Sequence, residues 1–189
     1  MSLRATTWQT VGPYFRIGLE PLYTWELASD GAAADRIIVE GRVVDALGAP
    51  IPDAVLEIWQ ANAAGKYAHE EDTQDKPLDP QFKGFGRIPT NEDGRFRFAT
   101  IKPGPVPGPG DSDQSPHLVV TVLMRGLLRG LVTRAYFPGE PLLSSDPILK
   151  LVEPSRRATL ILQPSQETPT VFQWEIRLQG EDETVFFDF

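Results

Sequence analysis

The sequence predicts an all-β protein: a single β-sandwich of about eight strands, with an N-terminal arm and long loops. Short runs of β-branched and aromatic residues alternate with turn-forming residues along most of the 189 positions. No helical pattern extends beyond about ten residues. The 16 glycines and 18 prolines supply turns, while a hydrophobic content of 41% is enough for a core. The chain length suits one domain.

The central element is expected between Ala54 and Tyr67. Apolar side chains fall on both faces of the run from Val55 to Gln60, which is typical of a strand that is at least partly buried on both sides. A turn-forming run then ends at Gly65 and delivers Tyr67 and His69 to the end of the sheet.

The other elements follow from alternation and turn signals. Strands are expected at 36–44, 86–90, 95–98, 118–124, 131–137, 159–163 and 171–178. The turn Asn91-Glu92-Asp93-Gly94 joins two of them, and loops occupy 68–86 and 102–116. Five prolines in the second loop should make it stiff. The clearest alternation predicts that Phe172, Trp174 and Ile176 point inward.

Residues 1–35 are interpreted as an arm that packs on a partner chain, and residues 36–189 as the sandwich domain. The arm carries Trp8, Tyr14, Phe15 and other large apolar side chains without a clean period, so it should need a surface to cover it. The C-terminal string TVFFDF should also be packed rather than solvated.

Composition excludes several classes of function. With no cysteine, the chain can form neither a disulfide nor a thiolate metal site. A formal net charge of −8 argues against nucleic acid as a partner. The N-terminus has no apolar signal segment, and no apolar run approaches the roughly 18 residues of a membrane span. We therefore expect a soluble, cytoplasmic protein.

A set of motifs in fixed order resembles the intradiol ring-cleaving dioxygenases, non-haem ferric enzymes that open catechol rings between the two hydroxyls. The motifs are TVGPYF, GRVVDALGAPIPDAVLEIWQAN, GKY, GFGR, TIKPG, PHL, TRAYFPG and the terminal GEDETVFFDF. Each one is weak alone, but together they cover nearly the whole chain. The resemblance implies an intradiol dioxygenase-like sandwich.

The resemblance also implies an iron site, which in this family uses two tyrosines and two histidines. Hard ferric iron favours phenolate and imidazole ligands. Tyr67 occupies the first tyrosine position, but the second is Val106, in the string Pro105-Val106-Pro107. His117 occupies the first position of the H-x-H motif, and Val119 the second. With two donors left of four, this chain is expected to hold no iron.

In two-chain members of the family, an iron-free alpha chain adjoins a beta chain that keeps all four ligands. The resemblance therefore implies that Fe(3+) is bound by a partner beta chain, and that a catechol and O2 react at the alpha–beta interface. By motif, Thr10, Gly12, Pro13 and Tyr14 of this chain would line the substrate pocket. Arg125 would lie near the same pocket, where a guanidinium could pair with a substrate carboxylate.

Simpler interpretations stand beside these. Gly12-Pro13 can be only a turn, Arg125 a solvated charge, and His117 a hydrogen-bonded structural residue. A zinc or ferrous site made from Tyr67, His69 and His117 is disfavoured, because no carboxylate has a ligand-type spacing to the histidines.

Two other functions remain open on the sequence: a self-sufficient catechol dioxygenase, and a non-catalytic transthyretin-like binding module. The module class shares the pattern G-x-V-x-D-x-x-G-x-P-x-x-x-A but lacks the aromatic arm and the FFDF tail that this chain has.

Overall fold

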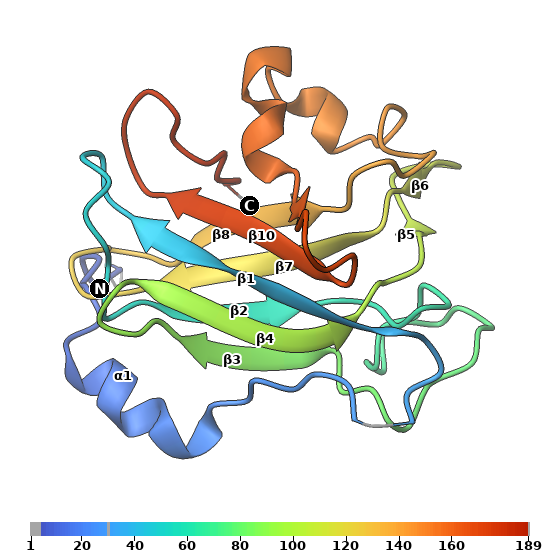
Figure 1. Ribbon diagram of the computed structural model, residues 1–189, viewed down its shortest axis with the longest axis horizontal. Coiled ribbons are helices and arrows are strands. Elements are labelled where there is room, and N and C mark those ends of the chain that lie inside the picture. The colour runs from blue at the N-terminus through green and yellow to red at the C-terminus, as the bar shows by residue number, and fades with distance from the viewer. Residues whose placement is uncertain (1–4, 30, 189) are drawn as a thin grey trace, which may run out of the picture.

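Two four-stranded sheets pack face to face in the computed structural model, which describes residues 5–29 and 31–188 (Figure 1). Residues 1–4 of the predicted arm, Asp30 and Phe189 of the terminal motif lie outside the described residues. The two sheets hold eight strands within the described part, so the prediction of a single β-sandwich is confirmed.

The first sheet has the order β4-β1-β10-β9, and the second has the order β3-β2-β7-β8. A two-stranded hairpin, β5-β6, lies within the proline-rich loop. The strands are β1 (Arg36–Val44), β2 (Val55–Trp59), β3 (Phe85–Pro89), β4 (Arg95–Ile101), β5 (Val106–Pro107), β6 (Asp113–Gln114), β7 (His117–Leu123), β8 (Leu131–Tyr136), β9 (Gln163–Pro164) and β10 (Val171–Arg177). The helices are α1 (Tyr14–Leu19) and the 3-10 segments η1 (Glu20–Leu22), η2 (Leu149–Leu151) and η3 (Pro154–Leu160).

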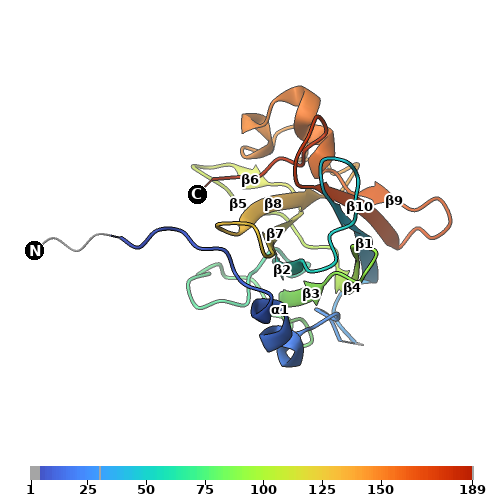
Figure 2. The same cartoon turned by 90° about the vertical axis from the view of Figure 1, so that its left-hand side faces the viewer.

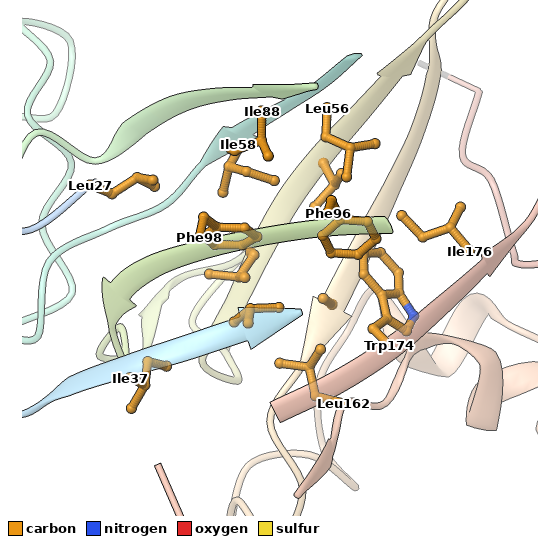
Figure 3. Close-up of a cluster of buried hydrophobic side chains, with 14 of the residues drawn as sticks. Leu27, Ile37, Leu56, Ile58, Ile88, Phe96, Phe98, Leu162, Trp174 and Ile176 are labelled. Carbon is orange, nitrogen blue, oxygen red and sulfur yellow. The ribbon is translucent and has the colours of Figure 1, made fainter. Parts of the chain in front are cut away.

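The core forms where the inward positions of the two sheets meet. Phe96 and Phe98 of β4 and Trp174 of β10 face Leu56 and Ile58 of β2 in Figure 3, and all five are buried. Burying one such side chain contributes about 1.5–3 kcal/mol, so this shared cluster is the main term that holds the sheets together. The inward positions predicted for Trp174 and Ile176 are confirmed.

The strand expected to organise the chain is an inner strand of the second sheet, paired with β3 on one side and β7 on the other. Its Leu56 and Ile58 enter the core. Because side chains alternate along a strand, Glu57 and Trp59 point to the opposite, outer face of the sheet. That outer face carries the groups discussed below.

The strand expected at 159–163 is wrong in its placement. Most of the chain from Pro154 to Leu160 is the 3-10 segment η3, and the strand that follows, β9, contains only Gln163 and Pro164. Proline at the start of η3 has a helix-compatible φ, and the segment buries Leu160 against Tyr136, Leu149 and Val152. Tertiary packing therefore overrides the local β-propensity of this run.

The segment before β1 is partly separate from the sandwich and partly built into it. Figure 2 shows the first described residues leading away from the body before α1 begins. Further along, Leu27 and Ala28 are buried in the main core, and Glu26 forms a bridge to Ala99. Among residues 5–29 and 31–188, no helix is long and apolar enough to cross a membrane.

Candidate interface site and former metal position

The outer face of the second sheet carries residues at the four positions that the resemblance assigns to metal ligands, called the former ligand positions below. Across the strands, Trp59 is registered with Val119, and Val119 with Arg134. In the same β7–β8 pair, His117 is opposite Tyr136. Residues registered across neighbouring strands project from the same face, so these five side chains share one end of the sheet.

Tyr67 reaches this end of the sheet because of a turn that only glycine fits. Gly65 has φ of 77°, and a Cβ built on it would lie 1.9 Å from the carbonyl oxygen of Pro105. The Asn62 Oδ1 accepts hydrogen bonds from the backbone N–H groups of Ala64 and Lys66, each at 3.0 Å, which closes the turn. The close approach sets Tyr67 beside the loop that carries Val106.

The Tyr67 ring stacks on Trp59, with the ring centroids 5.7 Å apart and an interplanar angle of 8°. Its backbone N–H donates to Asp72 Oδ2 at 2.7 Å. Tyr67 and Val106 both line a cavity of about 620 Å³, together with Trp59, His69, Gln114 and neighbouring residues of the 71–74 loop. The structure thus brings two of the four former ligand positions to one cavity, and one of the two cannot donate an electron pair.

His117 is buried, and its Nδ1 lies 2.7 Å from the carbonyl oxygen of Ser115. A carbonyl only accepts, so Nδ1 carries the proton in this contact. Burial lowers the pKa of His117 to about 4, and the nearby charge of Arg134 acts in the same direction. The imidazole is therefore neutral at pH 7 and is held in one tautomer by the backbone.

Arg134 places a positive charge at the same end of the sheet, with only 9% of its surface exposed. Its Nη1 donates to Gln114 Oε1 at 2.6 Å and to the Tyr136 hydroxyl at 3.4 Å. Its buried Nε has no hydrogen-bond partner among the residues that the structure describes. The hydroxyl of Tyr136 in turn donates to the buried carboxylate of Asp146 at 3.2 Å.

The charge of Arg134 also acts on two phenols nearby, those of Tyr67 and Tyr136. Burial raises the pKa of the Tyr67 phenol, and the Arg134 charge offsets part of that rise. Burial also raises the pKa of Tyr136. Both phenols are therefore neutral at pH 7.

The residues at this position do not fit a ferric ion. Two potential donors remain, Tyr67 and His117, and the two valines at the other ligand positions have no lone pairs. Within residues 5–29 and 31–188, no group of three or more histidine, aspartate or glutamate residues could hold a metal. A nearby buried guanidinium would also repel a cation.

The arm reaches the opposite end of the same sheet, where Thr10 lies next to the turn that carries Arg125. The Thr10 Oγ1 accepts a hydrogen bond of 2.6 Å from the backbone N–H of Gly126. Arg125 forms an ion pair with Asp53, with 2.6 Å between Nε and Oδ2. The structure therefore brings Thr10 and Arg125 together, although 115 positions separate them in the sequence.

Gly12 and Pro13 lie where the arm turns into α1. Pro13 is the N-cap of α1, and the backbone N–H of Phe15 donates to the carbonyl of Gly12 at 3.1 Å. This places Tyr14 at the first position of the helix, with 81% of its surface exposed. Two residues later, Arg16 Nη2 donates to the carbonyl of Thr90 at 3.0 Å and ties the helix to the sandwich.

The segment before β1 also exposes large apolar side chains. They are Trp8, Tyr14, Ile17, Leu22 and Trp25, and each of these side chains is at least half exposed. Large apolar side chains gathered on one segment are typical of a surface that another chain covers.

Sequence reasoning missed Asp53, Thr90, Gln114 and Arg134. Arg134 lies within the TRAYF motif, and its alternation with Tyr136 on a predicted strand places the two on one face. Nothing in the sequence indicated that Arg134 faces the former ligand positions, because that depends on the register between β7 and β8.

The chain is similar to known dioxygenases. A family model described as Dioxygenase matches residues 12–180. The chain is 39% identical to the protocatechuate 3,4-dioxygenase alpha chain of Burkholderia cepacia, over 99% of this chain and 98% of that one. It is 42% identical to the beta chain from the same organism, over 79% of this chain and 67% of that one. The solved 3-chlorocatechol 1,2-dioxygenase of Rhodococcus opacus matches with a TM-score of 0.64 and 28% identity, over 81% of this chain and 63% of that structure.

Proposed function

Because this chain belongs to the intradiol dioxygenase family, we propose that it is the alpha, iron-free subunit of a protocatechuate 3,4-dioxygenase. With a beta chain that binds ferric iron, it would cleave protocatechuate with O2 to 3-carboxy-cis,cis-muconate, a step in the catabolism of aromatic compounds. The observation that supports this most is that the chain has the sandwich fold of the family, while Val106 and Val119 stand at two of the four implied ligand positions and Arg134 lies opposite Val119.

Ferric iron held by the beta chain would supply the activation of the catechol ring toward O2. This chain would shape the pocket around that ring. Thr10, Gly12, Pro13 and Tyr14 would form one wall, because α1 presents Tyr14 away from its own sandwich. The apolar surface of the arm would be buried against the beta chain, which would also exclude water from the pocket.

Arg125 would contribute charge to this wall. Protocatechuate carries a carboxylate besides its two hydroxyls, and a guanidinium is well suited to bind it through paired N–H donors. The Arg125 side chain is 61% exposed in the isolated chain, so it is accessible to a ligand at an interface. Its role would be to bind and orient the substrate.

The test is to purify this chain alone and together with a beta chain that has all four ligands. We expect the chain alone to be colourless, free of iron by metal analysis and unable to consume O2 with protocatechuate. The co-expressed pair should copurify, show the visible absorption of iron-tyrosinate and turn over protocatechuate.

The same experiment separates the other two functions. Stoichiometric iron and O2 uptake with the chain alone would support a self-sufficient catechol dioxygenase and overturn the proposal. Failure to copurify with any ligand-complete beta chain would favour the transthyretin-like binding module.

A further inference from the structure

In the Asp53–Arg125 ion pair, the aspartate is the more buried partner. The carboxylate of Asp53 is only 19% exposed, while the arginine side chain is 61% exposed and reaches outward from the sandwich. The pair engages Nε of the guanidinium, at 2.6 Å. Nη1 and Nη2, which carry the other four N–H donors, have no hydrogen-bond partner among the residues that the structure describes.

Asp53 has little freedom to move, because Thr90 holds the turn on both sides of it. The Thr90 hydroxyl donates to the carbonyl of Ile51 at 2.8 Å and accepts from the backbone N–H of Ala54 at 3.1 Å. Thr90 itself is 1% exposed, so these bonds are shielded from water. The carboxylate is therefore presented from a fixed turn that leads directly into β2.

The arm is fixed to these same two turns. At one end, Thr10 accepts from Gly126, the residue next to Arg125. At the other end, Arg16 donates to the carbonyl of Thr90. The pocket-wall residues between them, Gly12 to Tyr14, are thus held in register with the guanidinium by contacts on both sides.

We propose that Asp53 is a positioning residue for the substrate carboxylate, acting through Arg125; this inference rests on the proposed function. By pairing with Nε, Asp53 limits the rotamers of a long, exposed side chain and leaves Nη1 and Nη2 for a carboxylate. An arginine that is already ordered loses less conformational entropy when it binds a ligand, so affinity rises. Asp53 does not touch the substrate.

A competing effect has the opposite sign. The negative charge of Asp53 also repels a substrate carboxylate, so its removal could strengthen binding. The two effects can be separated, because loss of positioning raises KM for protocatechuate and loss of repulsion lowers it. Because the Asp53 carboxylate is already paired with Nε, its charge is partly neutralised. We therefore expect the loss of positioning to change KM more than the loss of repulsion does.

The test uses the complex with the beta chain and compares Asp53→Asn with wild type. We expect KM for protocatechuate to rise about tenfold, because the guanidinium loses the partner that orders it, with kcat within about twofold. The inhibition constant of catechol, which has no carboxylate, should not change. Asp53→Glu should restore part of the affinity, and Asp53→Asn should add little in an Arg125→Gln background.

Asp188→Asn is the matched control. Asp188 pairs with Arg129 at 2.7 Å, and that arginine comes from the same loop as Arg125 and is also exposed. This variant should leave KM for protocatechuate unchanged. Iron content and the thermal unfolding midpoint, measured for every complex, identify any variant that fails to fold. If Asp53→Asn fails to fold, the milder substitution Asp53→Glu is compared with wild type instead.

The outcomes distinguish this inference from the proposed function. If the wild-type complex cleaves protocatechuate and Arg125→Gln raises KM, but Asp53→Asn leaves KM unchanged or lowers it, the positioning role is wrong and the proposed function stands. An equal rise for protocatechuate and catechol would show a general structural role instead. A wild-type complex that does not cleave protocatechuate would remove both.

Discussion

Val119 and Arg134 are cross-strand partners in the β7–β8 pair. One residue occupies a former metal-ligand position, and the other brings a buried positive charge to the same face. The charge is fixed by Gln114 and Tyr136, so it cannot swing away at low cost. Two of the four ligand positions implied by the resemblance therefore hold no donor, and a group that opposes a cation lies on the same face.

Restoring the donors alone should not restore a metal site. We expect the double variant Val106→Tyr/Val119→His to bind ferric iron weakly, because the Arg134 guanidinium still repels the ion. Adding Arg134→Gln should raise the iron content toward about one per chain and produce the visible absorption of iron-tyrosinate. Arg134→Gln alone, with only two donors, serves as the control. Full iron occupancy in the double variant would show that Arg134 is no barrier.

The turn before Tyr67 should tolerate no side chain at Gly65. A Cβ there would lie 1.9 Å from the Pro105 carbonyl oxygen, and φ is 77°, so Gly65→Ala should lower the free energy of unfolding by about 3 kcal/mol or more. Gly48→Ala is the control for φ alone: Gly48 has φ of 79° but nothing within 4 Å of the added Cβ, and should lose only about 1 kcal/mol. Urea denaturation of both variants measures the difference. Equal losses would mean that the 102–107 loop moves aside easily.

The buried His117 should make stability depend on pH. Its pKa is about 4 in the folded chain, below its usual value of 6.5, so the unfolded chain binds the proton first as pH falls. The stabilising contribution is complete above pH 6.5 and is lost between pH 6.5 and 4, by up to about 3 kcal/mol.

This pH dependence can be measured by urea denaturation at pH 7 and pH 4.5, for wild type and for His117→Phe. The wild-type chain should lose more stability than the variant over this interval, because phenylalanine does not titrate. The exposed His69 remains in both proteins and cancels in the comparison. Parallel losses in the two proteins would mean that His117 is solvated and titrates normally.

The features predictable from sequence are those set by local patterns. Alternation located β10 and its inward Trp174, and the turn at Gly65 placed Tyr67 at a strand end. The prediction of a strand at 159–163 was wrong, because Pro154 and the burial of Leu160 favour a 3-10 segment. The burial of Leu160 depends on tertiary packing.

Contacts between distant segments were beyond local patterns. Asp53 and Arg125 are 72 positions apart, and Arg134 meets Gln114 only because β8 and the β5-β6 hairpin converge. Such pairs depend on strand register and on the path of the loops, which single-residue propensities cannot predict. Most charged residues of the candidate site, Asp53 and Arg134 among them, were therefore recognised only in the structure.

The contact between Thr10 and Gly126 should matter in the complex and hardly at all in the isolated chain. Thr10 is exposed, so Thr10→Val, which keeps the shape but removes the acceptor, should change the free energy of unfolding of this chain by less than about 0.5 kcal/mol. In the complex, the arm would lose its register with Arg125, and kcat/KM for protocatechuate should fall about tenfold. Thr10→Ser keeps the hydroxyl and should retain most of the activity.

Steady-state kinetics of the three complexes, at matched iron content, test this directly. If Thr10→Val and Thr10→Ser are equally active, the hydrogen bond to Gly126 does not set the position of the pocket wall, and the contact of Arg16 with Thr90 must suffice to hold the arm.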